Sequence, residues 1–239
     1  LTNTGSYEKC WRLIDGGWWM YKSGTPNEYF SELFICKLGE KLGLDMAHYE
    51  MDDGYIRTRN FTDGTGLNFE PISSLMGENE DYSDCFETIS AISPKLAEQY
   101  LKIVWMDTVC YNMDRHTENF GFLREIKSGE IVSMAPNYDN NIALISRGYP
   151  DDVSRKSDGL MRFFREFLAE NETAGQMYRN MELPVITKEL IGACLDEIPV
   201  EADREYIQSF ILNGQTAVRD IIHSENLTEV QDQSMGLTL

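Results

Sequence analysis

The tetrapeptide Thr25-Pro26-Asn27-Glu28 constrains the fold of the first part of the chain more than any other feature. Thr25 suits the N-cap position of a helix, Pro26 its first turn, and Glu28 completes a capping box three residues after the cap. Apolar residues then recur at helical spacing until Gly43, which provides a stop signal. The sequence therefore predicts one helix that begins directly after Thr25 and ends before Gly43.

Four strands are expected around this helix, two before it and two after it. They cover residues 11–14, 18–22, 47–51 and 55–61. The first pair flanks Asp15-Gly16-Gly17, which is typical of a β-hairpin turn, and Asp52-Asp53-Gly54 divides the second pair. The order strand, strand, helix, strand, strand predicts a small α+β lobe over residues 1–65.

The rest of the chain is expected to be mainly helical, with one β interlude. Helices are expected over residues 94–111, 159–169, 188–196 and 202–223. A hairpin is expected over residues 120–126 and 131–134, and a solvated acidic loop over residues 78–84. We therefore predict a larger helical lobe over residues 66–225, followed by a flexible tail over residues 226–239.

The charge of the chain limits its partners. It carries 21 Lys and Arg residues against 40 Asp and Glu residues, a net charge of −19, which argues against a broad surface for nucleic acid or anionic lipid. No apolar stretch is long enough for a transmembrane helix, and no secretory leader is visible. The five cysteines are scattered without a C-x-x-C pair, as expected for reduced thiols. These features predict a cytoplasmic protein with neither membrane nor direct nucleic-acid contact.

The most informative segment is residues 112–121, between an expected helix and an expected strand. Asp114 and Asn119 have the Asp-x-x-x-x-Asn spacing of phosphotransferases with the kinase fold, in which the Asp orients the acceptor hydroxyl and takes its proton while the Asn holds Mg²⁺. Asp139 follows a strand twenty residues further on and is well placed to be a second metal ligand. Asp and Asn are also common turn residues, so each of them alone could be structural.

Several segments resemble the HipA-like serine/threonine kinases, a family that includes bacterial toxin kinases of toxin–antitoxin systems. The resemblance rests first on N-M-D-R-H-T-E-N-F-G-F-L from Asn112 and M-A-P-N-Y-D-N-N from Met134. T-G-S-Y-E-K from Thr4 is similar to the phosphate loop of the family, W-W-M-Y-K-S-G from Trp18 to its lysine-bearing strand, and N-E-Y-F from Asn27 to the following helix. It implies a bilobal, protein-kinase-like α+β fold with a small N-terminal and a larger C-terminal lobe.

The resemblance implies the roles given above for the motif residues and adds others. Lys22 would contact the α- and β-phosphates of ATP, and Glu28 would orient it through an ion pair. Glu28 also has the capping position, so Glu32, one turn further on, is the alternative partner. His116 would either brace its loop or act in catalysis. Arg115 would either neutralise phosphate charge or pair locally.

The resemblance also implies where the nucleotide lies. Gly5 and Ser6 would belong to the phosphate loop, and the hinge that receives adenine would fall near Arg59 to Phe61. Phosphate on Ser6 or Thr4 would repel the phosphates of ATP, so one of these hydroxyls is expected to be an autophosphorylated regulatory site.

The expected activity is transfer of the γ-phosphoryl group of ATP, with Mg²⁺, to a Ser or Thr hydroxyl of a protein, with an antitoxin or accessory subunit as a further partner. One alternative is a lipid or small-molecule kinase of the same fold, against which the net charge counts. The other is a nucleotide-binding pseudokinase that acts as a regulator. The presence of every catalytic residue type counts against it, and the sparse phosphate loop favours it.

Overall fold

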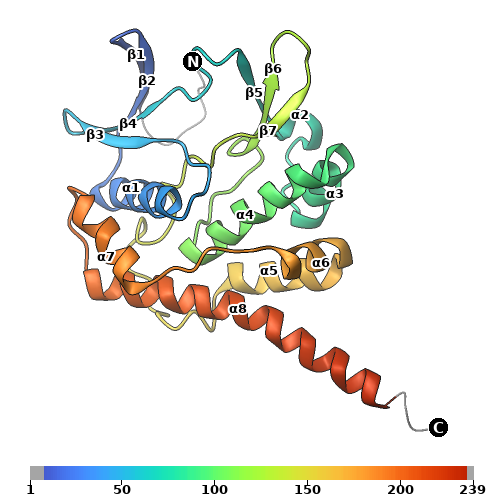
Figure 1. Cartoon of the computed structure of the whole chain (residues 1–239). Coiled ribbons are helices and arrows are strands. Elements are labelled where there is room, and N and C mark those ends of the chain that lie inside the picture. Colours follow the sequence, from blue (N-terminus) through green and yellow to red (C-terminus); the bar gives the residue numbers. More distant parts are fainter. Residues whose placement is uncertain (1–7, 236–239) are drawn as a thin grey trace.

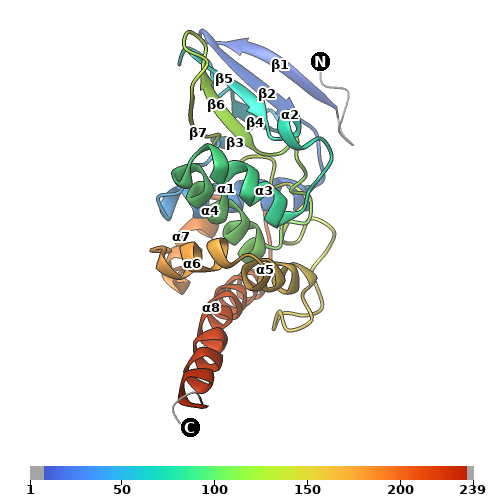
Figure 2. The same ribbon diagram turned by 90° about the vertical axis from the view of Figure 1, so that its right-hand side faces the viewer.

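A computed structural model describes the backbone of residues 8–235 and the side chains of residues 8–221. Two antiparallel sheets lie at one end of the molecule, with α2 (Ser73–Met76) beside the second of them, and most of the helices occupy the other end (Figures 1 and 2). The first sheet has the order β1-β2-β4-β3, with β1 (Lys9–Ile14), β2 (Gly17–Lys22), β3 (Tyr49–Asp52) and β4 (Tyr55–Arg59). The second has the order β5-β6-β7, with β5 (Leu67–Pro71), β6 (Gly121–Glu125) and β7 (Ile131–Met134).

The first part of the chain forms the predicted elements. The β1–β2 hairpin turns at Asp15 and Gly16, whose φ angles of 50° and 80° give the left-handed backbone that such turns need. Helix α1 (Pro26–Lys41) begins with both bonds of the capping box: the Glu28 amide donates to the Thr25 hydroxyl, and the Thr25 amide donates to the Glu28 carboxylate. The strand, strand, helix, strand, strand prediction is confirmed.

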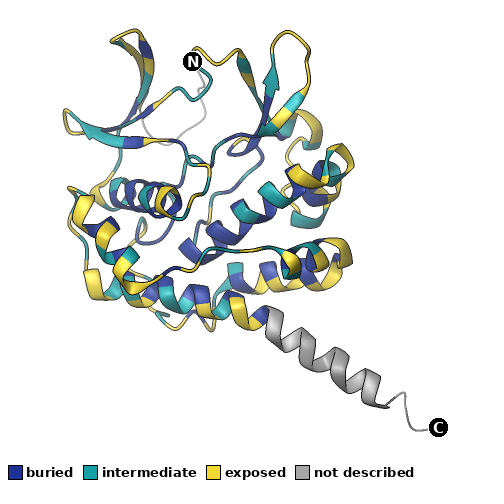
Figure 3. Ribbon diagram, viewed as in Figure 1, coloured by how far each residue is buried: buried dark blue, intermediate teal, exposed yellow. Residues whose placement is uncertain are grey.

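Helix α1 joins the first sheet to the helical part of the molecule. Leu33 and Cys36 pack with Tyr49 and Ile56 of the sheet. The opposite face of α1, which includes Phe34, belongs to the main core. Because both faces are covered, this helix is buried over most of its length (Figure 3). Side chains on α1 can therefore reach both halves of the molecule.

The helical part is built around α4 (Pro94–Cys110), in which every residue from 103 to 110 is buried (Figure 3). The other helices are α2 (Ser73–Met76), α3 (Tyr82–Ile92), α5 (Gly159–Glu170), α6 (Glu172–Asn180), α7 (Lys188–Glu197) and α8 (Arg204–Met235). The helices predicted from residues 94, 159, 188 and 202 are all present. The α+β architecture, with an N-terminal sheet and a helical C-terminal part, is confirmed.

Helices α2 and α6 were not predicted, and three further features differ from the sequence analysis. Strand β5 was not predicted, because its hydrogen bonds go to β6, far away in the sequence. Helix α3 begins inside the acidic segment predicted as a loop, where the Asp81 carboxylate caps it by accepting hydrogen bonds from the amides of Ser83 and Asp84. Helix α8 continues to Met235 and so overlaps the segment predicted as a tail from residue 226.

Gly121 sets how closely β5 and β6 approach each other. A Cβ atom at this position would lie 2.2 Å from the Glu70 carbonyl oxygen and 2.7 Å from Pro71 Cα. We expect Gly121→Ala to lower the free energy of unfolding by about 1–3 kcal/mol, because backbone would have to move to accept the methyl group. Denaturant unfolding measures this. Gly159→Ala is the matched control, since nothing lies within 4 Å of the added atom. Equal midpoints for the two variants would contradict the expectation.

Two further predictions concerned membrane-spanning helices and the state of the cysteines. No helix within residues 8–235 combines the length and apolarity needed to cross a bilayer. All five cysteines are free, with Cys10 exposed and the other four buried.

Candidate functional site

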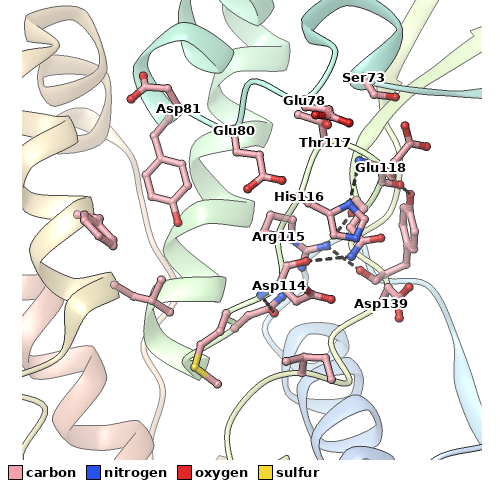
Figure 4. A pocket seen from close by; sticks show the side chains of 18 of the residues that line it. Ser73, Glu78, Glu80, Asp81, Asp114, Arg115, His116, Thr117, Glu118 and Asp139 are labelled. Carbon is pink, nitrogen blue, oxygen red and sulfur yellow. Dashed lines mark hydrogen bonds between the residues drawn. The ribbon is translucent and has the colours of Figure 1, made fainter. Parts of the chain in front are cut away.

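A cleft of about 1730 Å³ opens between the two sheets and the helices. Its walls come from β1, β2 and β5, from the segment 73–83, from the loops 112–119 and 138–142, and from α5. Figure 4 labels some of the lining residues, among them Asp114, Glu118 and Asp139. Six residues singled out in the sequence line it: Lys22, Asp114, Arg115, His116, Asn119 and Asp139. The fold therefore brings the predicted catalytic and metal-binding residues to one cavity.

Within the loop 112–119, the side chains of Asn112 and Asn119 bond to the backbone of Asp114. The loop follows the left-handed residue Tyr111, with φ 59°, which ends α4 and turns the chain towards the cleft. The Asp114 amide donates to Asn112 Oδ1 at 3.2 Å, and Asn119 Nδ2 donates to the Asp114 carbonyl oxygen at 2.9 Å. Both bonds use the main chain of Asp114. Its carboxylate takes no part in either of them and lies half-buried at the cleft wall.

Lys22 is the centre of a charge cluster at the inner end of the cleft. Its ammonium group forms an ion pair with Asp139 and lies 3.6 Å from Glu32 Oε2, while Lys9 Nζ lies 3.8 Å from Asp139 Oδ2. Burial acts to lower the pKa of Lys22, but the charges of Asp139 and Glu32 outweigh it and raise the pKa. Burial likewise acts to raise the pKa of Asp139, and the charges of Lys22 and Lys9 bring it below its ordinary value. Lys22 and Asp139 are thus held ionised.

The predicted ion pair between Lys22 and Glu28 is wrong, and the alternative partner, Glu32, takes its place. The Glu28 carboxylate turns back to the Thr25 amide at 2.7 Å, because the capping box needs it there. Glu32 lies one turn further along α1 and is almost fully buried, with a side chain 1% exposed. Burial raises the pKa of Glu32, and the charge of Lys22 opposes this rise.

These two glutamates give a matched pair of variants. If the activity that the resemblance implies is correct, Glu32→Ala is expected to lower ATP turnover by roughly 10- to 100-fold, because Lys22 loses a carboxylate that helps to orient it in the cleft. Glu28→Ala removes one of the two bonds of the capping box and should cost about 1 kcal/mol of stability while turnover changes little. Steady-state turnover and thermal unfolding of both variants decide this. Equal losses of turnover in Glu32→Ala and Glu28→Ala would show that Glu32 does not orient Lys22 for the reaction.

Arg115 pairs locally. It is buried, and its guanidinium group forms an ion pair with Asp107 of α4 at 2.8 Å. The sequence analysis missed Asp107. The signal was present, since this carboxylate lies inside the apolar run of α4, and buried charges in such places need a partner.

The structure places the predicted hinge residues outside the cleft wall. Arg59 is exposed, and neither it nor Phe61 is among the residues described here that line the cleft. Phe61 instead packs against Phe69 and Tyr138, with ring centroids 5.8 Å apart in both pairs. Phe69, Tyr138 and Met20 do line the cleft. Met20 could have been found from the sequence, because it precedes Lys22 by two residues and strand side chains alternate.

The remaining predicted residues fall into two groups. His116 lines the cleft, and its Nδ1 accepts a hydrogen bond from the Glu118 amide at 3.2 Å, so the ring braces its own loop. Gly5, Ser6 and Thr4 lie outside the described residues. Their predicted roles in phosphate binding and autophosphorylation stay predictions.

Carboxylate and amide oxygens are the ligands that Mg²⁺ prefers, and Asn119 and Asp139 supply one of each to the cleft. In this structure the Asp139 carboxylate contacts Lys22 and Lys9. A bound metal ion would replace part of the positive charge that Lys22 and Lys9 now place beside the Asp139 carboxylate. The residues present therefore fit the metal.

Comparisons with known proteins show the family of the chain. The family model of the HipA-like C-terminal domain matches residues 8–197. The fold is similar to a Helicobacter pylori proinflammatory kinase, CtkA, with a TM-score of 0.67 and 18% identity over 93% of this chain and 95% of that chain. HipA of Shewanella oneidensis MR-1, solved with HipB and operator DNA, gives a TM-score of 0.48 and 12% identity over 92% of this chain and 64% of that chain. No curated protein sequence matches significantly. Because the family match covers well over half of the sequence, the chain belongs to the family of HipA-like C-terminal domains.

Proposed function

We propose that this protein is a serine/threonine protein kinase that transfers the γ-phosphoryl group of ATP with the help of Mg²⁺. Membership of the HipA-like kinase family implies protein kinase activity and ATP use at the level of the family. The observation that carries the proposal for this chain is the convergence of Lys22, Asp114, Asn119 and Asp139 on one cleft. They come from three separate segments of the chain, and packing alone would not require these segments to meet.

Each residue has a distinct task in this proposal. Lys22 would bind phosphate oxygens of ATP, exchanging part of its contact with Asp139 for them. Asn119 and Asp139 would hold Mg²⁺, which when bound neutralises charge on the phosphates. Asp114 would accept a hydrogen bond from the acceptor hydroxyl, orient it towards the γ-phosphorus and take its proton. Catalysis would then consist mainly of positioning and charge neutralisation.

The apolar part of the cleft suits a nucleotide base. Met20, Phe69 and Tyr138 line the cleft together with Lys22. The two rings pack edge to face with centroids 5.6 Å apart, and Phe61 supports both of them from outside. We therefore place the base against this wall instead of at the Arg59–Phe61 hinge.

The outer part of the cleft favours a protein acceptor over a lipid. Six exposed carboxylates line it: Glu78, Glu80, Asp81, Glu118, Glu166 and Glu170 (Figure 4 labels four of them). This charge would repel an anionic headgroup and attract basic side chains beside an acceptor hydroxyl. It supports a Ser- or Thr-containing segment with Lys or Arg nearby as the acceptor.

The experiment is transfer of radiolabelled γ-phosphate from ATP, with Mg²⁺, to three acceptors offered in parallel. These are Ser/Thr peptides with basic flanks, the same peptides with acidic flanks, and phosphoinositide vesicles. We expect transfer to the basic peptides first. Transfer to the vesicles alone would favour the lipid kinase alternative. ATP binding without transfer to any acceptor or to the protein itself would favour the pseudokinase.

A further inference from the structure

The side chain of Arg115, which like Asn119 belongs to the loop 112–119, reaches the loop 137–140, which carries Asp139. Arg115 Nη1 donates to two backbone carbonyl oxygens, that of Asn119 at 2.7 Å and that of Tyr138 at 2.7 Å. Its Nη2 donates to the side-chain oxygens of Asn137 and Asn140, each at 2.7 Å. One guanidinium group therefore ties the loop 112–119 to the loop 137–140.

The same group is anchored to helix α4. Arg115 Nε and Nη2 each donate to one oxygen of Asp107 at 2.8 Å, a bidentate ion pair whose side chains are both 3% exposed. Asn112 Nδ2 also donates to Asp107 Oδ1, at 2.8 Å. The loops are thus fixed to the most deeply buried helix of the molecule.

These contacts leave the Arg115 guanidinium group without a free N–H donor for a phosphate. A guanidinium group has five N–H donors, one on Nε and two on each Nη. The acceptors bonded to it are at least as many: one at Nε, two at Nη1 and three at Nη2. A nucleotide phosphate could bind this group only by breaking bonds that hold the site together.

The network also reaches Lys22. The backbone amide of Asn140 donates to Glu32 Oε1 at 2.9 Å, and Glu32 is an ion-pair partner of Lys22. Asn140 Oδ1 in turn accepts from Arg115. An unbroken chain of polar contacts therefore runs from Lys22 through α1 and the loop 137–140 to Arg115.

We infer that Arg115, anchored by Asp107, is a positioning residue that sets the Asn119 loop against the Asp139 loop, so that the two metal ligands are correctly placed before the metal binds. The inference rests on the proposed function. Residues that orient metal ligands from behind typically change metal affinity by about 10- to 100-fold when they are replaced. Arg115 is expected to act on the metal in this way, through the loops alone.

The variant Arg115→Lys separates this role from phosphate binding, because lysine keeps the charge but not the planar fork. The first measurement is Mn²⁺ affinity by electron paramagnetic resonance, with a non-hydrolysable ATP analogue present. We expect it to fall about 10- to 100-fold. The second is the ratio of the affinities for ATP and adenosine without metal, which should stay within about twofold because the phosphate-binding Lys22 is retained. A large fall in this ratio, or an unchanged Mn²⁺ affinity, would overturn the inference.

Arg155→Lys is the matched control for loss of a buried arginine. Arg155 has a side chain 1% exposed, pairs with Asp158, and donates to the carbonyl oxygens of Thr108 and Val109, but it bonds neither loop. We expect it to lower stability without weakening Mn²⁺ binding. A fall in Mn²⁺ affinity equal to that of Arg115→Lys would show a general effect of destabilisation and overturn the inference.

A milder variant covers the case in which Arg115→Lys does not fold. Asn137→Ala removes one acceptor of Arg115 and leaves Asp107 in place. It should weaken Mn²⁺ binding in the same direction by a smaller factor, and an unchanged affinity would count against the inference. If the wild-type protein itself binds no Mn²⁺, the proposed function fails and the inference with it. Wild-type binding with no change in the variants overturns the inference alone.

Discussion

Asp114→Asn should reduce phosphoryl transfer by about 10²- to 10⁴-fold, the usual contribution of a positioned general base. The amide cannot accept the proton of the acceptor hydroxyl, although it has nearly the same shape as the carboxylate. The loop should keep its form, because the bonds to Asn112 and Asn119 use only the backbone of Asp114. ATP affinity should therefore change by less than about twofold.

Single-turnover transfer and calorimetric ATP binding measure the two expectations separately. Glu130→Gln is the control, because it neutralises an exposed carboxylate of the β6–β7 hairpin outside the cleft. It should leave both quantities unchanged. Full transfer activity in Asp114→Asn would remove this residue from the reaction and with it the main support for the assigned chemistry.

Asp139→Ala has the second large expected effect, a change in ATP affinity whose direction depends on whether Mg²⁺ is present. With Mg²⁺ present we expect ATP to bind more than about tenfold more weakly, because a carboxylate ligand of the metal is lost. Without metal, ATP should bind as tightly as before or more tightly. The reason is that Asp139 no longer competes with the phosphates for Lys22 and Lys9.

Titration of ATP in excess Mg²⁺ and again in excess chelator separates these two cases. The wild-type protein under both conditions provides the reference. If Asp139→Ala weakens ATP binding by the same factor with and without metal, the carboxylate serves the structure of the site and does not hold a metal ion.

The sequence predicts well those elements whose interactions are local. The capping box at Thr25 and Glu28 needs residues only three apart, and it forms as predicted. The β1–β2 turn depends on the left-handed backbone at Asp15 and Gly16, and strand β7 occupies the predicted residues. Short-range hydrogen bonds and backbone preferences decide these features before any distant segment has to be placed.

Features that depend on distant partners could not be found in this way. Strand β5 has a pairing partner only because the loop and strand that follow α4 return to it, so its own residues give a weak signal. Arg59 and Phe61 were predicted to receive adenine, but neither is among the described residues that line the cleft, whereas Met20, Phe69 and Tyr138 do line it. Which side chains face a cavity depends on how separate elements pack, and a single sequence does not state it.

The candidate site shows the same division. The sequence alone determined which chemical groups are available, since Asp114, Asn119 and Asp139 are recognisable by type, order and spacing, and Lys22 by the resemblance of its strand to that of the family. The tertiary structure decided how they are paired. The sequence left Glu28 and Glu32 as alternative partners of Lys22; in the structure the Glu28 carboxylate accepts from the Thr25 amide in the capping box, and Glu32 is the one that contacts Lys22. Burial decided the rest, because a charge enclosed in the interior must find partners, and those partners come from segments that only folding brings together.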